Sequence, residues 1–332
     1  MLALAAVFFL LHKKRRRAAV FLLLAAAAAA LAYGFWRTRV QAVPDTEHAA
    51  PTYAAVPTPT PSPTLAPTPT VIPTPTVMPA STPPAPERDS WVLSFAGDCT
   101  IGPLHEWQGA SARHNMLYVM DGDYTYPLSD VAALFGDDDF TMVNLEGTFT
   151  ACTDAVSKPY RFRAPPEAAQ VLTEGNVEAV TLANNHTGDY RDQGLADTRT
   201  ALEAVGVLYA DETAPLITEL PDGPKLGILA FNCVEIDLAV GDVNGYMQRV
   251  TPLYDQCVQA DCDLILAYVH WGWEYRTAPE LWMEEFAHAL ADLGCDMVIG
   301  SHPHVLQKAE RYQGVPIFYS LGNFCYGGHS AP

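Results

Sequence analysis

From residue 91 onward, short apolar runs alternate with amphipathic stretches, and this alternation limits the folds open to the chain more than any other feature. The runs are 4 to 7 residues long, which suits a β-strand and is short for a helix. Their apolar residues are mostly uninterrupted, as in strands that are buried on both faces. The predicted strands span residues 91–96, 140–143, 177–183, 225–231, 263–269, 296–300 and 315–320.

The stretches between these runs have helical character. Three of them, 166–175, 194–206 and 279–294, predict amphipathic helices, and in the last one Leu281, Phe286, Ala289 and Leu293 fall near helical spacing. Strands that alternate with helices indicate an α/β domain with a largely parallel arrangement of strands. We therefore expect one such domain over residues 89–332, which is long enough to fold by itself.

Six of the predicted strands end in polar side chains. These side chains are Asp98; Asn144 and Glu146; Asn184, Asn185 and His186; His270; His302 and His304; and Asn323. In open α/β sheets, ligands bind at the carboxyl ends of the strands. The sequence therefore predicts that these residues gather at one rim as a ligand site.

The chemistry of this set indicates a metal centre. Carboxylates, an amide and several imidazoles suit Mn, Fe or Zn. A bridging carboxylate would also allow two ions, as in centres that activate water. Taken singly, His270 or Asn185 is more often a hydrogen-bonding residue at a strand end, and Asn144, Asn184 and Asn323 are expected to tie loops together or support a substrate. Because six strand ends turn polar together, we favour the metal or substrate site.

The chain before residue 89 predicts export. Residues 18–36 form an uncharged apolar run of 19, long enough to cross a membrane as a helix. The basic run 13–17 precedes it, which places residues 1–17 in the cytoplasm and the rest outside. The chain is thus predicted to be a single-pass membrane protein with a signal anchor; a signal peptide cleaved near Ala30-Leu31-Ala32, which would release a secreted protein, is the alternative.

Residues 37–88 are dominated by Pro and Thr and cannot form a packed core. We expect a disordered linker with polyproline II character, in which residues 44–86 form a stalk of up to about 130 Å at roughly 3.1 Å per residue.

Net charge and cysteine content limit which binding partners and metal sites are possible. Beyond residue 40 the chain carries 12 Lys and Arg against 38 Asp and Glu, a formal charge of 12 − 38 = −26. This argues against nucleic acid, and against a polyanion unless cations bridge the two. The seven cysteines are odd in number and contain no CxxC pair, so no thiolate metal site is indicated. One or two disulfides are possible in an exported domain, and the sequence does not indicate which cysteines pair.

The motifs SFAGD, NLEG, LANNH, HWGWEY, GSHPHVLQ and SLGNF, together with KPYRFRAPP and residues 192–194, occur in this order over about 91–326. As a combination they resemble the bacterial capsule-synthesis CapA family, which is associated with poly-γ-glutamate and related to the calcineurin-like metallophosphoesterases. The resemblance implies a sandwich of sheets flanked by helices. It also implies further strands beyond the last motif, so we expect a chain shortened at its C-terminus or a sheet edge closed by a partner.

The resemblance also implies roles for matching positions. Asn185, His270 and His302 would hold one ion, Asp98 and His304 the other, with Glu146 bridging and His186 as general acid. Two departures stand out: Thr100 occupies the place of a ligating His, and the bridging residue is Glu rather than Asp. The sequence is therefore compatible with one metal ion or with two.

Two functions remain. The first is a metal-dependent hydrolase or transferase acting on a phosphoester, or on a γ-glutamyl or other amide bond, of a cell-envelope polymer. The second is a non-catalytic scaffold or polymer-binding subunit that holds the polymer near a membrane synthase or export subunit.

Overall fold

Two β-sheets form the centre of the domain. The computed structural model describes residues 7–10, 90–104, 115–236 and 238–326. The first sheet has six strands: β1 (Val7–Leu10), β2 (Val92–Thr100), β3 (Phe140–Leu145), β6 (Ala179–Thr181), β7 (Leu208–Ala210) and β14 (Asn323–Tyr326). Here β2, β3, β6 and β7 are successive parallel neighbours, and β14 also pairs in parallel with β2.

The second sheet also has six strands: β8 (Leu216–Glu219), β9 (Lys225–Asn232), β10 (Leu264–His270), β11 (Met297–Ser301), β12 (Ala309–Tyr312) and β13 (Val315–Phe318). Its four central strands are parallel, and β8 and β12 run antiparallel at the two edges. A separate short pair joins β4 (Thr148–Phe149) to β5 (Arg163–Ala164).

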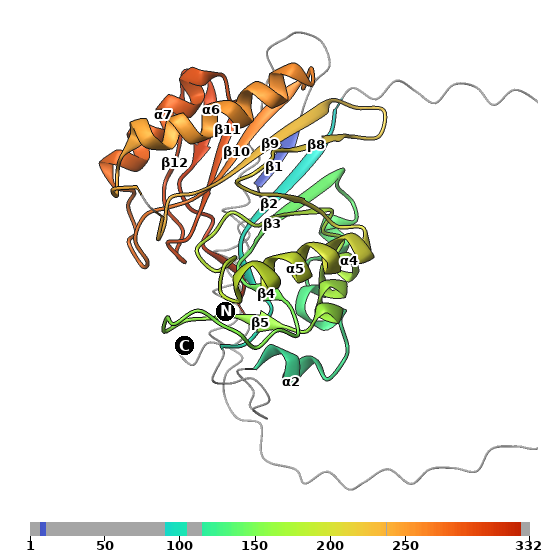
Figure 1. Cartoon of the computed structure of the whole chain (residues 1–332). Helices are drawn as coiled ribbons and strands as arrows, with labels where there is room; N and C mark the ends of the chain where they lie inside the picture. The colour runs from blue at the N-terminus through green and yellow to red at the C-terminus, as the bar shows by residue number, and fades with distance from the viewer. Residues whose placement is uncertain (1–6, 11–89, 105–114, 237, 327–332) are drawn as a thin grey trace, which may run out of the picture. The chain divides into compact units, whose positions relative to one another are not determined.

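Helices cover the outer face of each sheet (Figure 1). The first sheet carries α2 (Met116–Met120), η2 (Tyr126–Leu128), α3 (Ala132–Phe135), η3 (Pro166–Ala169), α4 (Gln170–Glu174) and α5 (Arg191–Val205). The second carries α6 (Val243–Gln259) and α7 (Leu281–Leu293).

Three apolar cores hold these layers together. The middle core lies between the sheets and joins Phe95 of β2 to Ile228 of β9 and Tyr268 of β10. The two outer cores lie between each sheet and its helices. The central strands are therefore buried on both faces, which explains why they are continuous apolar runs in the sequence.

The predicted α/β architecture with sheets and flanking helices is confirmed. The other predicted strands lie wholly or largely within observed ones, but the strand predicted at 177–183 is shorter, because β6 covers only Ala179–Thr181. The helix predicted at 166–175 is shorter, because it begins as the 3-10 turn η3. Helix α6 and the edge strands β8 and β12 were not predicted. The predicted end of the first strand at residue 96 was wrong, since β2 continues to Thr100.

The predicted span 18–36 and linker 37–88 lie outside the described residues. None of the helices in the described part of the chain has the length and apolarity that a membrane span requires.

Strand β1 comes from the segment 1–17 that the predicted topology places in the cytoplasm. It pairs antiparallel with β2, with Val7 opposite Phe95. A membrane span at 18–36 would put these two strands on opposite sides of the bilayer. The pairing and the anchored topology therefore exclude one another within a single molecule.

A candidate metal centre

All ten site residues predicted from the sequence lie together and are joined by contacts. Nine of them stand near or just after the carboxyl ends of strands, and Asn323 is the first residue of β14. The first sheet and its loops supply Asp98, Asn144, Glu146, Asn184, Asn185, His186 and Asn323; the second supplies His270, His302 and His304. The site is thus built between the two sheets, from strands that are far apart in the sequence.

Glu146 lies at the middle of this group. Its side chain is fully buried, and neither carboxylate oxygen has a hydrogen-bond partner among the described residues. Oε1 lies 3.7 Å from His270 Nε2 and 3.9 Å from His186 Nε2, and Oε2 lies 3.9 Å from His304 Nδ1. A buried carboxylate without partners is costly, so this position fits a cation.

Burial raises the pKa of Glu146 well above its usual value, and the neighbouring Asp98 carboxylate raises it further. His304 acts in the opposite direction and lowers it. Positive charge placed beside this carboxyl therefore favours its ionised form against the effect of burial.

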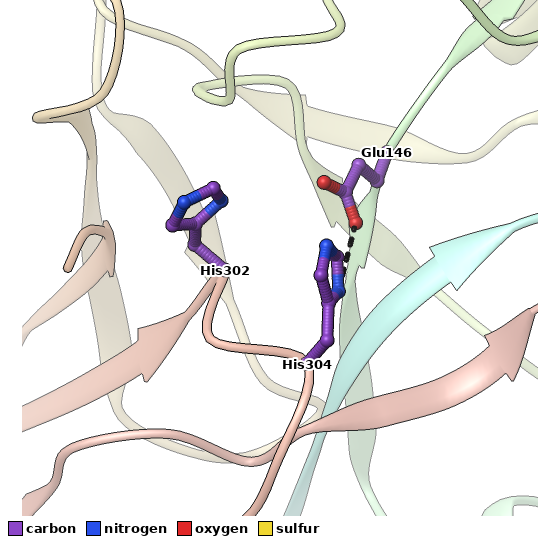
Figure 2. A group of neighbouring side chains, drawn as sticks. All are labelled: Glu146, His302 and His304. Carbon is purple, nitrogen blue, oxygen red and sulfur yellow. Dashed lines mark ion pairs between the residues drawn. The ribbon is translucent and has the colours of Figure 1, made fainter. Parts of the chain in front are cut away.

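His302 and His304 face Glu146 from the loop after β11 (Figure 2). One ligand atom from each of these three residues lies within 4.8 Å of the other two. Both histidines have left-handed backbone angles, with φ of 93° and 56°. Such angles cost about 1 to 3 kcal/mol each in non-glycine residues. The surrounding contacts therefore hold this loop in a strained conformation that places the two rings on the rim.

A bulge in β2 aims Asp98 at the rim. The register with β3 shifts between Ala96 and Asp98, so Gly97 is the extra residue. Before it, Phe95 points into the core between the sheets, and after it Cys99 points into the outer core. A Cβ on Gly97 would lie 1.9 Å from the Gly322 carbonyl oxygen, so only glycine fits here.

Asp98 in turn holds His304. Asp98 Oδ2 lies 3.0 Å from His304 Nδ1, and Asn323 Oδ1 lies 2.9 Å from the same nitrogen. Burial alone lowers the pKa of His304, but the Glu146 and Asp98 carboxylates outweigh it and raise the pKa to about 10. The other Asp98 oxygen, Oδ1, accepts from Asn144 Nδ2 at 2.8 Å.

The imidazole of His270 is held in its neutral form. Burial, and then the charges of His302 and His304, lower the pKa of His270 well below its usual value. Its Nε2 lies 2.9 Å from Asn185 Oδ1, and its Nδ1 lies 3.0 Å from Ser301 Oγ. Burial likewise lowers the pKa of His302 to about 4, and His302 Nδ1 has no hydrogen-bond partner among the described residues. Neutral imidazoles are the form that binds metals.

Asn144 and Asn184 support the others. Asn184 Nδ2 donates to Asn144 Oδ1 at 3.0 Å and to the Leu145 carbonyl at 2.8 Å. Asn184 Oδ1 accepts the His186 backbone N–H at 3.0 Å. Both amides therefore fix the loops that carry Glu146 and His186.

Sequence reasoning missed two residues behind His186. Asp189 is fully buried, and its Oδ2 lies 2.9 Å from His186 Nδ1. Lys158 Nζ lies 2.9 Å from the other oxygen of Asp189 and donates to the Asn185 carbonyl at 2.6 Å. Asp189 stands three residues after His186, and that spacing is the signal that would have found it.

A cavity of about 810 Å³ opens beside the rim. Asn185 and His302 line one part of it, and Trp273, Tyr275 and Arg276 line another. Trp273 and Tyr275 are exposed aromatic side chains. They belong to the HWGWEY stretch, of which sequence analysis singled out only the histidine. The cavity gives a substrate room next to the candidate ligands.

The residues present fit a divalent cation of the Mn, Fe or Zn type, because they offer carboxylate oxygen, amide oxygen and neutral imidazole together. Thr100, which stands where a ligating His was expected, is buried, and its hydroxyl has no hydrogen-bond partner among the described residues. A neutral hydroxyl is a poor substitute for an imidazole. The donor set is therefore more complete around Glu146, His270 and His302 than around Asp98.

Comparison with known proteins places the chain in a family. The model of the family described as "Bacterial capsule synthesis protein PGA_cap" matches residues 92–327. The chain is 28% identical over 267 residues to the "PGA biosynthesis protein CapA" of Bacillus subtilis (strain 168), covering 74% of this chain and 67% of that one. It is 28% identical over 185 residues to the "Capsule biosynthesis protein CapA" of Bacillus anthracis, covering 51% and 45%.

A third relative, a "Probable polyglutamine synthesis accessory protein" of Mycobacterium tuberculosis (strain ATCC 25618 / H37Rv), is 29% identical over 246 residues, covering 63% of each chain. The chain thus spans about half to two thirds of the length of these relatives. The family match covers every motif on which the resemblance rested, and that prediction is confirmed: the chain belongs to the bacterial capsule synthesis protein PGA_cap family.

Proposed function

We propose that this protein takes part in capsule or poly-γ-glutamate biosynthesis as a metal-dependent hydrolase or transferase. Its substrate would be a phosphoester, or a γ-glutamyl or other amide bond, of an envelope polymer. The relatives are named for capsule or PGA biosynthesis. The observation that carries the proposal is the buried Glu146 carboxylate, which has no hydrogen-bond partner within the described part of the chain and lies among His186, His270 and His304.

In this proposal Asn185, His270 and His302 would hold one ion, Asp98 and His304 would provide a second and weaker position, and Glu146 would serve both. A metal ion held there supplies Lewis acidity and lowers the pKa of a bound water. The domain belongs, in this proposal, with the calcineurin-like metallophosphoesterases.

His186 acts as the general acid. Asp189 accepts a hydrogen bond from the Nδ1–H group of His186 and so fixes the tautomer and the orientation of the ring. Nε2 then faces the rim, 3.9 Å from Glu146. A proton on Nε2 is then placed to reach the atom that leaves the substrate. Lys158 holds Asp189 in place through an ion pair.

The second candidate function is a scaffold or polymer-binding subunit that works with a membrane synthase or export subunit. The observation that favours it is Thr100, whose hydroxyl stands in place of an imidazole. A centre that holds its ion weakly could bind polymer without turning it over.

Metal content of the purified full chain tests the centre. We expect one or two equivalents of Mn, Fe or Zn by mass spectrometry, and a loss of metal in Glu146→Gln and in His302→Ala. His288→Ala is the matched control, because His288 contacts Glu310 on the second sheet and is not part of the rim. A folded chain that takes up no metal when Mn, Fe and Zn are supplied would refute the hydrolase and leave the scaffold.

A complementation assay separates the two functions. In a host that depends on this protein for polymer, His186→Ala should abolish polymer production if the protein is catalytic, with protein level and metal content unchanged. Normal production by His186→Ala would favour the scaffold.

We also propose that residues 89–332 are exported, with 18–36 as a membrane anchor. A tag placed before residue 7 tests this topology. If the tag on intact cells is protected from external protease while the domain is not, the anchor holds and β1 is displaced from β2. A protected domain would contradict export.

A further inference from the structure

Two buried cysteines lie opposite each other beside the rim. Cys99 of β2 and Cys325 of β14 are paired in register on neighbouring parallel strands. Their exposed fractions are 0% and 2%, and both belong to the outer core of the first sheet. Interaction with the Cys325 thiol, and then burial, raises the pKa of Cys99 well above its usual value, as expected for neighbouring thiols. The seven cysteines are all free thiols in the structure.

A bulge in β14 creates this pairing. Asn323 lies opposite Asp98 and Cys325 opposite Cys99, so β14 uses two steps where β2 uses one, and Phe324 is the extra residue. Without the bulge, Phe324 would lie opposite Cys99, and the thiols would be out of register. Bulges re-aim side chains and are treated as built features of a sheet.

The backbone spacing suits a covalent link. Hydrogen-bonded strands lie about 4.7 to 4.9 Å apart, within the range of about 4.4 to 6.8 Å that disulfides span between Cα atoms. The thiols already face each other in one core, so closing the bond requires no movement of one strand past the other.

Strand β14 has reason to be fastened. Among the described strands it pairs only with β2. It carries Asn323, whose side-chain oxygen lies 2.9 Å from His304 Nδ1. Loss of β14 from β2 would therefore remove one of the two groups that orient His304, and would open the core behind Asp98.

We propose that Cys99 and Cys325 form a disulfide that fastens β14 to β2 and fixes Asn323 against His304. The link joins residues 325 − 99 = 226 positions apart, so it closes nearly the whole domain into one loop. The inference is independent of hydrolase activity, and it agrees with the proposed export, because disulfides persist in oxidising compartments.

The reaction balances with an external disulfide as oxidant. One thiolate attacks that disulfide and displaces a thiol, and the second cysteine thiolate then attacks the mixed disulfide. The two protein thiols lose two electrons and two protons, and the external disulfide is reduced to two thiols. Because both sulfurs are buried in the folded domain, the bond forms before β14 finishes packing.

The chain contains a matched control pair. The thiols of Cys257 in α6 and Cys262 also contact each other. Their sulfurs lie 2.6 and 3.1 Å from the point where a Cβ on Gly227 would stand. This pair packs behind the second sheet and contacts none of the rim residues.

Peptide mapping of the full chain is the first test. The chain is refolded in a glutathione redox buffer, and free thiols are alkylated before digestion. We expect a disulfide-linked peptide pair that contains Cys99 and Cys325, and its disappearance after reduction. Alkylation of both cysteines after refolding in oxidised glutathione would overturn the proposal.

Variants test the role at the rim. Dithiothreitol should lower the melting temperature and the bound Mn of the wild-type chain. Cys99→Ala with Cys325→Ala should show the lowered values with and without dithiothreitol, while Cys257→Ala with Cys262→Ala should respond as wild type does. A linked peptide whose reduction changes neither quantity would refute the fastening of β14, and a dithiothreitol effect that persists in the Cys99/Cys325 variant would assign it to another bond.

Discussion

The buried carboxylate of Asp189 sets the orientation of the neighbouring His186 ring. Asp189 also accepts the Phe162 backbone N–H at 2.7 Å and pairs with Lys158, so its position is fixed from three sides. With its orientation fixed, His186 presents Nε2 to the rim. The contact between His186 and Asp189 thus links the packing of this loop to the proposed general-acid role of His186.

If His186 is the general acid, Asp189→Asn should lower kcat on a chromogenic phosphodiester by about 10² to 10⁴, because the ring loses the partner that fixes its tautomer. Metal content should stay at the wild-type level. Asp197→Asn, which changes a carboxylate bonded to Thr150 and Gln193 outside the rim, should leave the rate unaltered. An unchanged rate in Asp189→Asn would remove Asp189 from the mechanism.

Asp211 predicts a pH dependence of stability away from the rim. Its carboxylate accepts from Thr213 N at 2.8 Å and Arg199 Nη2 at 2.5 Å. Burial alone raises the pKa of Asp211, but the bonds to Thr213 and Arg199 outweigh it, and the pKa lies below its usual value. The ionised form is therefore the one that folding stabilises, and this stability is present above the ordinary carboxyl pKa of about 4.

Asp211→Asn should thus lower the free energy of unfolding by about 1 to 3 kcal/mol at neutral pH. The difference from wild type should shrink as the pH falls through the lowered pKa of Asp211. Urea unfolding at several pH values measures it, with Asp222→Asn at an exposed turn as the control. A difference that stays constant down to pH 3 would contradict the ion-pair explanation.

Among the secondary-structure elements, β2 can supply a candidate ligand because the bulge at Gly97 turns the Asp98 side chain toward the rim. Gly97→Ala places a Cβ 1.9 Å from the Gly322 carbonyl oxygen, so β2 must move away from the turn before β14. Overpacking of this kind costs about 1 to 3 kcal/mol or more.

We expect Gly97→Ala to lower the melting temperature and to weaken metal binding, since Asp98 moves with the bulge. Gly188→Ala is the matched control, because a Cβ there meets nothing within 4 Å. Calorimetry and metal titration of both variants check the prediction. Equal behaviour of the two variants would show that the bulge is not needed.

The elements that the sequence pattern missed have two physical causes. Helix α6 contains Gly245 and Pro252, both of which lower helix propensity. It forms because Asp242 accepts the Gly245 N–H at 3.0 Å and because Tyr246 and Val250 pack on the second sheet. Strands β8 and β12 are short edge strands with half-exposed residues, so no continuous apolar run marks them.

At the scale of the whole molecule, the site depends on how the two sheets are held together. Tyr268 of β10 crosses the middle core, and its hydroxyl donates to the Ala96 carbonyl of β2. That bond joins the sheets immediately before the Gly97 bulge. It therefore helps to set the distance between the ligands that come from each sheet.

Tyr268→Phe should lower the free energy of unfolding by about 1 to 3 kcal/mol, because the buried Ala96 carbonyl loses its side-chain donor. Metal affinity should fall as well if the bond sets the spacing between the sheets. Denaturant unfolding and metal titration measure the two effects. Tyr209→Phe, which removes a hydroxyl bonded to Glu203 at the surface, should alter neither.

The local sequence determined the central strands, two of the long helices and the ten residues of the rim. Hydrophobic runs and the polar residues that follow them are properties of short segments, and a parallel sheet collects its strand ends at one edge. The long-range contacts decided the rest: the division into two sheets, the bulges at Gly97 and Phe324, the partnership of Asp189 with His186, and the pairing of Cys99 with Cys325. Register and packing join segments up to 226 residues apart, and the hydrophobic periodicity of one segment does not say which distant segment it pairs with.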